Sequence, residues 1–253
     1  VVPETYNGMP VTTIKTGALM NASITSLELP DTITYLENDS VYVGNMESFR
    51  IPKNLYYFAQ AFGDNRGSVD IIVPSNHAFF KEVEICNREA VVTKDKTALV
   101  FIDGIEDTET IFNLPDSYTE IMAYAFCGTH FKEINIPDSV TSIGIGAFRK
   151  VTCDKITISA SITAIADETF IYADCPSIVL PNTVEEIGEN AFSSSSLSSF
   201  TFPTSLKSIG ELAFFHTNLA GELVLPEGLE VIGDGAFCNC LLTSIVLPST
   251  LTD

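Results

Sequence analysis

A short pattern recurs along the whole chain at a nearly constant interval. An apolar segment ends in proline, an Ile-Gly or similar pair follows, and an Ala-Phe pair stands ten and eleven residues after the proline, as in residues 180–192. Successive strand-ending positions lie, with one exception, about 22 residues apart. Those positions are Pro30, Pro52, Pro74, Pro115, Pro137, Ser159, Pro181, Pro203, Pro226 and Pro248. Such a period predicts a solenoid, because one repeat cannot bury its apolar faces alone and the stack supplies the core.

The segment before each strand-ending position alternates apolar and polar residues, which is typical of a strand with one buried face. In residues 197–202, we expect Leu197, Phe200 and Phe202 to point inward and the residues between them to point outward. We expect residues 24–29 to form an equivalent strand.

The length of the repeat also indicates the type of solenoid. Repeats of roughly 20 to 29 residues are the signature of leucine-rich repeats. We therefore predict a right-handed leucine-rich-repeat solenoid with a long parallel β-sheet on one face and short irregular or helical turns on the other. Residues 1–253 are expected to form a single domain of about ten to eleven repeats of 22–23 residues. Stacked strands would then give a sheet roughly 45 Å long.

The regular interval breaks between Pro74 and Pro115, where one gap is nearly long enough for two repeats. Here two apolar segments, residues 90–92 and 98–102, flank the polar residues 93–97. This pattern predicts a β-hairpin insert near residues 75–111, either built into the solenoid or projecting from it. Two interpretations remain open: a local excursion with a solvated tip, or a functional protrusion of the kind that rigid scaffolds often carry.

The alternation of each strand predicts two columns of side chains on the outer surface of the sheet, and these columns are the candidate partner-binding face. The predicted binding residues are Glu28, Arg50, Ile72, Asn113, Glu133, Asn135, Lys155, Thr157, Val179, Thr201, Glu222, Val224 and Val246. The second column is rich in β-branched residues, which suit an exposed sheet without any further role. Alternatively, Val179, Val224 and Val246 form an apolar strip for a partner or for self-association.

Charge restricts the class of partner. The formal net charge is −20, and residues 156–253 contain twelve acidic residues against one base, Lys207. Such a surface repels phosphate groups, so nucleic acid and anionic lipid are poor partners. The chain has no uninterrupted apolar run long enough to cross a bilayer, so no membrane span is expected.

Neither end of the chain shows a targeting or capping feature. There is no initiator Met or signal core at Val1, so any export signal is expected to lie upstream. Residues 247–251 begin another repeat with no capping repeat after it. We therefore expect an apolar end face, through which open solenoid ends could self-associate.

The residues that usually carry chemistry do not form a recognisable site. The six cysteines include no CxxC pair, and no nucleophile motif occurs. Cys153 and Cys175 take leucine positions in neighbouring repeats and are expected to be buried; a disulfide is conceivable by distance, although stacked parallel side chains seldom give the required torsion. His77, His130 and His216 have no spacing typical of a metal site. Neither a metal nor a cofactor is expected, and the chain is not expected to be an enzyme.

Several phrases resemble the BspA-like leucine-rich repeats. They are I-P-D-S-V-T-S-I-G-I-G-A-F at residues 136–148, L-P-N-T-V-E-E-I-G-E-N-A-F at 180–192 and L-P-E-G-L-E-V-I-G-D-G-A-F at 225–237. Residues 3–12 are similar to the phrase that begins such arrays, and residues 94–100 resemble the hairpin insert of the family. The resemblance covers almost the whole chain, with departures at Ser40-Val41, at Thr169 and from Ser75 to Ile111.

The resemblance implies a bacterial protein that is secreted or attached to the cell surface. Several members of the family act in adhesion to host matrix or to other cells, and no enzymatic activity is associated with the repeat. The leading hypothesis is a non-enzymatic module that binds a protein partner, such as a host matrix or cell-surface protein. The alternative is a structural spacer or self-assembling stalk with no specific ligand. Carbohydrate binding or hydrolysis is disfavoured, because there is no Trp and no aromatic column among the outward positions.

Overall fold

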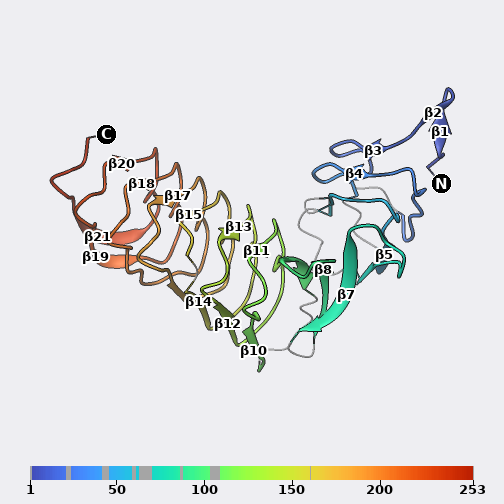
Figure 1. Cartoon of the computed structure of the whole chain (residues 1–253). Coiled ribbons are helices and arrows are strands. Elements are labelled where there is room, and N and C mark those ends of the chain that lie inside the picture. The colour runs from blue at the N-terminus through green and yellow to red at the C-terminus, as the bar shows by residue number, and fades with distance from the viewer. Residues whose placement is uncertain are drawn as a thin grey trace.

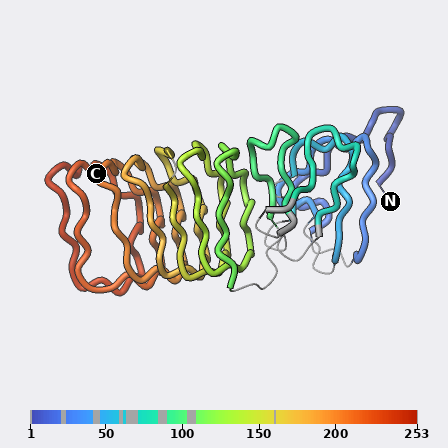
Figure 2. Tube along the Cα trace, turned by 60° about the horizontal axis from the view of Figure 1, so that its bottom comes forward, coloured from blue at the N-terminus to red at the C-terminus, as the bar shows by residue number. Residues whose placement is uncertain are grey.

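The computed structural model is an elongated β-solenoid whose turns stack side by side from the N-terminal to the C-terminal end (Figures 1 and 2). It describes residues 2–20, 24–41, 46–58, 61–62, 70–85, 88–102, 109–159 and 161–252. None of these residues is helical. The predicted solenoid is therefore confirmed, but the expectation of helical turns is not; short strands and hydrogen-bonded turns take their place.

Two sets of parallel strands lie on opposite sides of the turns (Figure 1). The strands that precede the prolines, called here the first ladder, are β5 (Ser48–Arg50), β6 (Asp70–Ile72), β10 (Ile111–Asn113), β12 (Glu133–Ile136), β14 (Lys155–Ile158), β16 (Ser177–Val179), β19 (Ala220–Val224) and β21 (Leu241–Val246). Those that follow the prolines, called the second ladder, are β3 (Thr13–Ile14), β4 (Tyr35–Leu36), β11 (Glu120–Ile121), β13 (Ser142–Ile143), β15 (Ala164–Ile165), β17 (Glu186–Ile187), β18 (Ser208–Ile209) and β20 (Val231–Ile232). A small antiparallel hairpin, β1 (Thr5–Tyr6) and β2 (Met9–Pro10), precedes them.

The first ladder is parallel as predicted, but its hydrogen bonding is interrupted. Its strands form the separate groups β5-β6, β10-β12-β14-β16 and β19-β21. Residues 24–29, which were predicted to be a strand, are irregular, and so are residues 197–202 between β16 and β19. In the described chain, the backbone N–H groups of residues 198–202 make no backbone hydrogen bond.

Bulky side chains account for the interruption at residues 197–202. Phe200 takes the position held by the buried Ile178 and Leu223 in the neighbouring turns, yet it is only half-buried. Its ring packs on Phe202 with centroids 4.9 Å apart and on Phe192 at 5.2 Å. Two phenylalanines in one strand need more room than the aliphatic pairs of adjacent turns, so this segment points its side chains inward as predicted but does not join the sheet.

A column of stacked phenylalanine rings forms the centre of the C-terminal core. The rings come from the Ala-Phe positions, and consecutive centroids from Phe126 to Phe237 lie 4.8, 5.2, 5.0, 4.9 and 5.3 Å apart. The ring planes are nearly parallel, within 5–17°. The members are Phe126, Phe148, Phe170, Phe192, Phe214 and Phe237. The repeat spacing thus places one ring per turn directly over the next.

The insert forms a layer of antiparallel strands within the solenoid stack, and we call this layer the wall. The predicted hairpin is confirmed: β8 (Arg88–Thr93) and β9 (Ala98–Ile102) pair antiparallel, and β9 also pairs parallel with β11. A third strand, β7 (Phe80–Ile85), which the sequence reading missed, pairs with β8. Every residue of β9 is buried, which is the reason for its continuous apolar sequence.

The wall separates two apolar cores. Leu99 and Ile102 of β9 pack into the C-terminal core, whereas Val100 and Phe101 pack into the N-terminal core. The tip is a short turn in which the Asp95 carboxylate accepts hydrogen bonds from the hydroxyls of Thr93 and Thr97, which lower the pKa of Asp95. The insert therefore lies within the stack, and a functional role for its tip remains a prediction.

Buried His77 leads to a prediction about pH. Its Nδ1 accepts hydrogen bonds from the backbone N–H groups of Phe79 (3.1 Å) and Phe80 (3.0 Å). Burial, the largest cause, lowers the pKa of His77 below its usual value near 6.5. The folded state keeps the ring neutral while the unfolded state binds a proton, so stability is lost as the pH falls below about 6.5.

We expect this loss to be at most about 1.4 kcal/mol per pH unit, down to the pKa of the folded protein. Urea unfolding at pH 7.5 and 5.5 measures it. The His77→Leu variant is expected to be less stable at both values, because two N–H groups lose their acceptor, but to lose less stability between them. An identical pH dependence in wild type and variant would contradict this role. Substitution of the exposed His216 by Leu is the matched control.

Candidate interaction surfaces

The outward residues of the first ladder lie in register, as the sequence predicted. Across β10, β12, β14 and β16, parallel pairing aligns Asn113 with Asn135, Thr157 and Val179, and Glu133 with Lys155. In the outer groups, Arg50 pairs with Ile72 and Glu222 and Val224 pair with Ser244 and Val246. Glu28 and Thr201 are exposed but lie in segments outside the hydrogen-bonded sheets. The predicted binding residues therefore form three separate groups.

The exposure of these side chains differs between the columns. Val179, Val224, Val246 and Ile72 are 45%, 61%, 46% and 41% exposed. Glu133, Asn135 and Thr157 are half-buried. The Asn135 side-chain amide donates a hydrogen bond to Asn113 Oδ1 at 2.9 Å. This bond fixes the orientation of both side chains.

A hollow of about 320 Å³ opens where the first ladder is interrupted. It lies between β16 and residues 199–202, and Val179, Asn182 and Thr201 are among its lining residues. Because the strands do not pair here, polar backbone atoms and apolar side chains are accessible together. This combination gives the first-ladder face a place where a partner could anchor.

Cys153 and Cys175 are buried in neighbouring turns, as expected, with their Sγ atoms 3.1 Å apart. The hydrogen bond to Cys175, followed by burial, raises the pKa of the Cys153 thiol. In the described parts of the chain, no three His, Cys, Asp or Glu side chains come together as a metal site. A search of the same residues for a long apolar helix that could cross a membrane finds none.

An aromatic cluster on the second-ladder side was missed in the sequence. Tyr35, Tyr57 and Phe79 take equivalent positions in successive repeats, and Tyr35 and Tyr57 stack with centroids 4.8 Å apart. Tyr56 packs between Tyr35 (5.8 Å) and Phe79 (6.3 Å), and Tyr56 and Phe79 are about half exposed. The signal for this cluster in the sequence is the constant 22-residue spacing of Tyr35, Tyr57 and Phe79.

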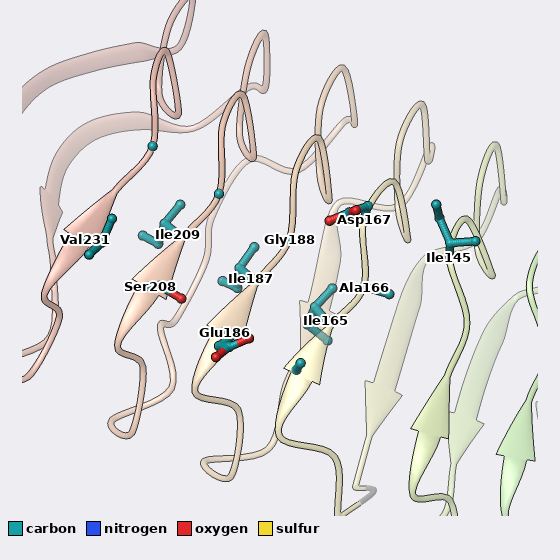
Figure 3. Close-up of a pocket in the computed structure, with 13 residues that line it drawn as sticks. Ile145, Ile165, Ala166, Asp167, Glu186, Ile187, Gly188, Ser208, Ile209 and Val231 are labelled. Atoms are coloured by element: carbon teal, nitrogen blue, oxygen red, sulfur yellow. The ribbon is translucent and has the colours of Figure 1, made fainter.

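A groove of about 470 Å³ crosses the second ladder in the C-terminal half (Figure 3). Ala164, Ala166, Gly188, Gly210 and Gly233 contribute the small side chains and bare backbone of its surface. Because glycine carries no side chain, neighbouring turns approach closely along this line. In the sequence, the Ile-Gly pairs indicate turns and do not predict a groove.

The comparisons with known proteins identify the family. The family model of the BspA type leucine rich repeat region matches six copies, over residues 5–88, 107–220 and 219–253. The chain belongs to the BspA-type leucine-rich repeat family. The departures from the family pattern between residues 75 and 111 coincide with the wall formed by β7, β8 and β9. A search of curated proteins found no significant match.

Two solved structures show the same fold. A leucine rich cell surface protein from Faecalibacterium prausnitzii A2-165 superposes with a TM-score of 0.60 at 22% identity, covering 94% of this chain and 58% of that protein. A leucine-rich repeat protein from Eubacterium ventriosum gives a TM-score of 0.56 at 20% identity, covering 95% of this chain and 65% of the other. This BspA-type chain thus spans less than two thirds of the length of either relative.

Proposed function

We propose that this chain is a non-enzymatic, secreted or cell-surface module that binds a protein partner, and that it acts in adhesion to a host matrix or cell-surface protein. Membership of the BspA-type family supports a repeat protein of a kind that is typically non-catalytic. The cell-surface description of the Faecalibacterium relative supports the location. The observation that carries the proposal is the exposed, in-register first-ladder face with its aliphatic side chains.

The chemistry of this face suits contact with protein. Exposed valines flanked by small polar residues lose little conformational entropy on binding, and the parallel strands hold them at fixed spacing. The hollow beside Val179 offers a site for a partner side chain. Affinity would come from many modest contacts on a preformed surface, and Val179 and Val224 are two of the exposed aliphatic side chains on it.

A capture experiment tests the proposal. Matrix and host-cell surface proteins are passed over the immobilised chain and over the Val179→Glu/Val224→Lys double variant, which leaves the net charge unchanged. We expect the wild type to capture a defined protein and the double variant to retain less than a tenth of it. Val231→Glu is the matched control, because Val231 is a 41% exposed valine on the second ladder.

Three results would contradict the first-ladder assignment or the function itself. Equal capture by the wild type and the double variant would show that Val179 and Val224 are not part of the binding site. If Val231→Glu lost as much captured protein as the double variant, added charge anywhere on the surface would be disrupting binding. Capture of nothing, together with concentration-dependent end-to-end assembly in sedimentation that Leu251→Asp abolishes, would favour a spacer or self-assembling stalk.

A further inference from the structure

Two cysteines lie side by side in the buried core of the C-terminal half. Cys153 and Cys175 take the same position in neighbouring turns, and their side chains are in contact across an interval of 22 residues. Cys153 is 6% exposed and Cys175 is fully buried. The equivalent positions in the turns on either side are Phe131 and Leu197, which are also buried. This column of the core therefore holds two small side chains between two large ones.

The local backbone brings the two thiols together. Both cysteines lie just before the strands β14 and β16 and just after the bridge between Thr152 and Asp174. The Cys153 backbone N–H donates a hydrogen bond to the Asp174 carbonyl at 3.0 Å. Adjacent turns in a parallel stack are roughly 4.8 Å apart, a separation within the Cα range that a disulfide accepts.

The side chains do not point in parallel directions. The Sγ atoms of Cys153 and Cys175 are 3.1 Å apart, which is less than the usual spacing of the turns, so the two side chains lean toward each other. Neither cysteine belongs to a regular strand. The parallel side-chain geometry that opposes a disulfide between stacked strands therefore does not apply to this pair.

Hydrogen bonding alone gives the pair little in the reduced state. The Cys175 thiol donates to the Ser177 carbonyl at 3.4 Å, besides its contact with Cys153. A thiol is a weak donor and a weak acceptor, so these contacts contribute modestly. In the parts of the chain that the structure describes, the pair has no third His, Cys, Asp or Glu with which to hold a metal ion. The geometry thus suits a covalent bond better than a metal site.

We propose that Cys153 and Cys175 form a disulfide that links two neighbouring turns of the solenoid. The oxidant is a low-molecular-weight or enzyme-bound disulfide. One cysteine thiolate attacks a sulfur of that disulfide and releases the first thiol, and the other cysteine then attacks the protein sulfur of the mixed disulfide and releases the second thiol. The protein loses two electrons and two protons, and the oxidant is reduced to two thiols. Because both cysteines are covered in the folded chain, the exchange occurs while the turns stack.

The disulfide ties β14 to β16 and restricts the unfolded chain. It closes a loop of one repeat, and such a constraint stabilises the fold mainly by lowering the entropy of the unfolded state. The inference rests on the proposed function in one respect, since a secreted or cell-surface location supplies the oxidising environment. Refolding in vitro depends neither on that location nor on a partner, so this inference and the proposed function can fail separately.

Refolding followed by peptide mapping tests the proposal. The chain is reduced in urea and refolded with a mixture of oxidised and reduced glutathione, and the remaining thiols are alkylated in urea. Trypsin cleaves after Lys150, Lys155 and Lys207. We therefore expect peptide 151–155 to be joined to peptide 156–207 before reduction, and the cysteines of both peptides to escape alkylation. Cys238→Ala removes an exposed thiol and is the matched control, which is expected to keep the link.

Melting temperature provides a second readout. The protein refolded with oxidised glutathione is expected to melt about 5 °C or more above the protein refolded with a reductant. Cys153→Ala and Cys175→Ala lose core volume and are expected to melt lower, but with no difference between the two refolding conditions. Alkylation of all six cysteines, pairing of Cys153 with another cysteine, or equal melting temperatures of the wild type after both refoldings would overturn the proposal.

Discussion

Replacement of Phe170 by alanine is expected to lower the free energy of unfolding by about 3–5 kcal/mol. Phe170 is fully buried in the middle of the phenylalanine column, with Phe148 and Phe192 stacked on its two faces at 5.2 and 5.0 Å. The substitution removes the buried apolar area and both ring contacts, and it leaves a cavity that the rigid turns cannot close. Urea unfolding followed by circular dichroism measures the change.

The end of the same column supplies the control. Phe237 is half-buried and has one stacked neighbour, Phe214, at 5.3 Å. Phe237→Ala is therefore expected to cost about half as much as Phe170→Ala. Equal losses at the two positions would mean that the column does not act as a stack of pairwise contacts.

Replacement of Gly210 by valine is expected to destabilise the protein by about 3 kcal/mol or more, at the upper limit of the usual overpacking cost. A Cβ atom on Gly210 would lie 2.7 Å from the carbonyl carbon of Gly188 and 2.8 Å from the backbone nitrogen of Glu189. Both are backbone atoms of the neighbouring turn, so relief of the clash requires the two turns to separate. Thermal unfolding measures the effect as a lowered midpoint or as loss of the folded signal.

Ser208→Val tests whether the effect comes from the glycine position itself. Ser208 lies on β18, two residues before Gly210, and its half-buried side chain points outward. The same valine is expected to change stability by less than about 0.5 kcal/mol there. A Gly210→Val protein with the wild-type midpoint would show that the turns are not in close contact along this line.

The repeat period was sufficient to predict the stack and its inward residues. The constant spacing of the Ala-Phe pairs fixes one ring per turn, and strand alternation assigns Leu197 and Phe202 to the interior, where both are buried. The hairpin β8-β9 was also predictable, because two apolar segments flank a polar turn. These features depend on local pattern and on identical repetition, which a sequence displays directly.

Features that depend on neighbouring turns could not be predicted in the same way. The interruption at residues 197–202 results from the combined volume of Phe200, Phe202 and the rings they contact, which no single repeat reveals. The groove across the second ladder depends on how closely the glycines bring neighbouring turns together, which no single repeat reveals. The β7 strand required knowledge of its partner, β8.

The most direct test of the binding function is amide hydrogen exchange on the chain alone and in complex with the captured protein. Our account predicts slower exchange on binding in peptides that cover β12, β14, β16 and residues 197–202, whose backbone N–H groups from residue 198 to 202 lack backbone partners in the free chain. It predicts no change in the second ladder at β17 and β18 for a partner captured through the first ladder. Protection confined to the second ladder, or spread evenly over both sides, would contradict the assignment of the first-ladder face as the binding surface.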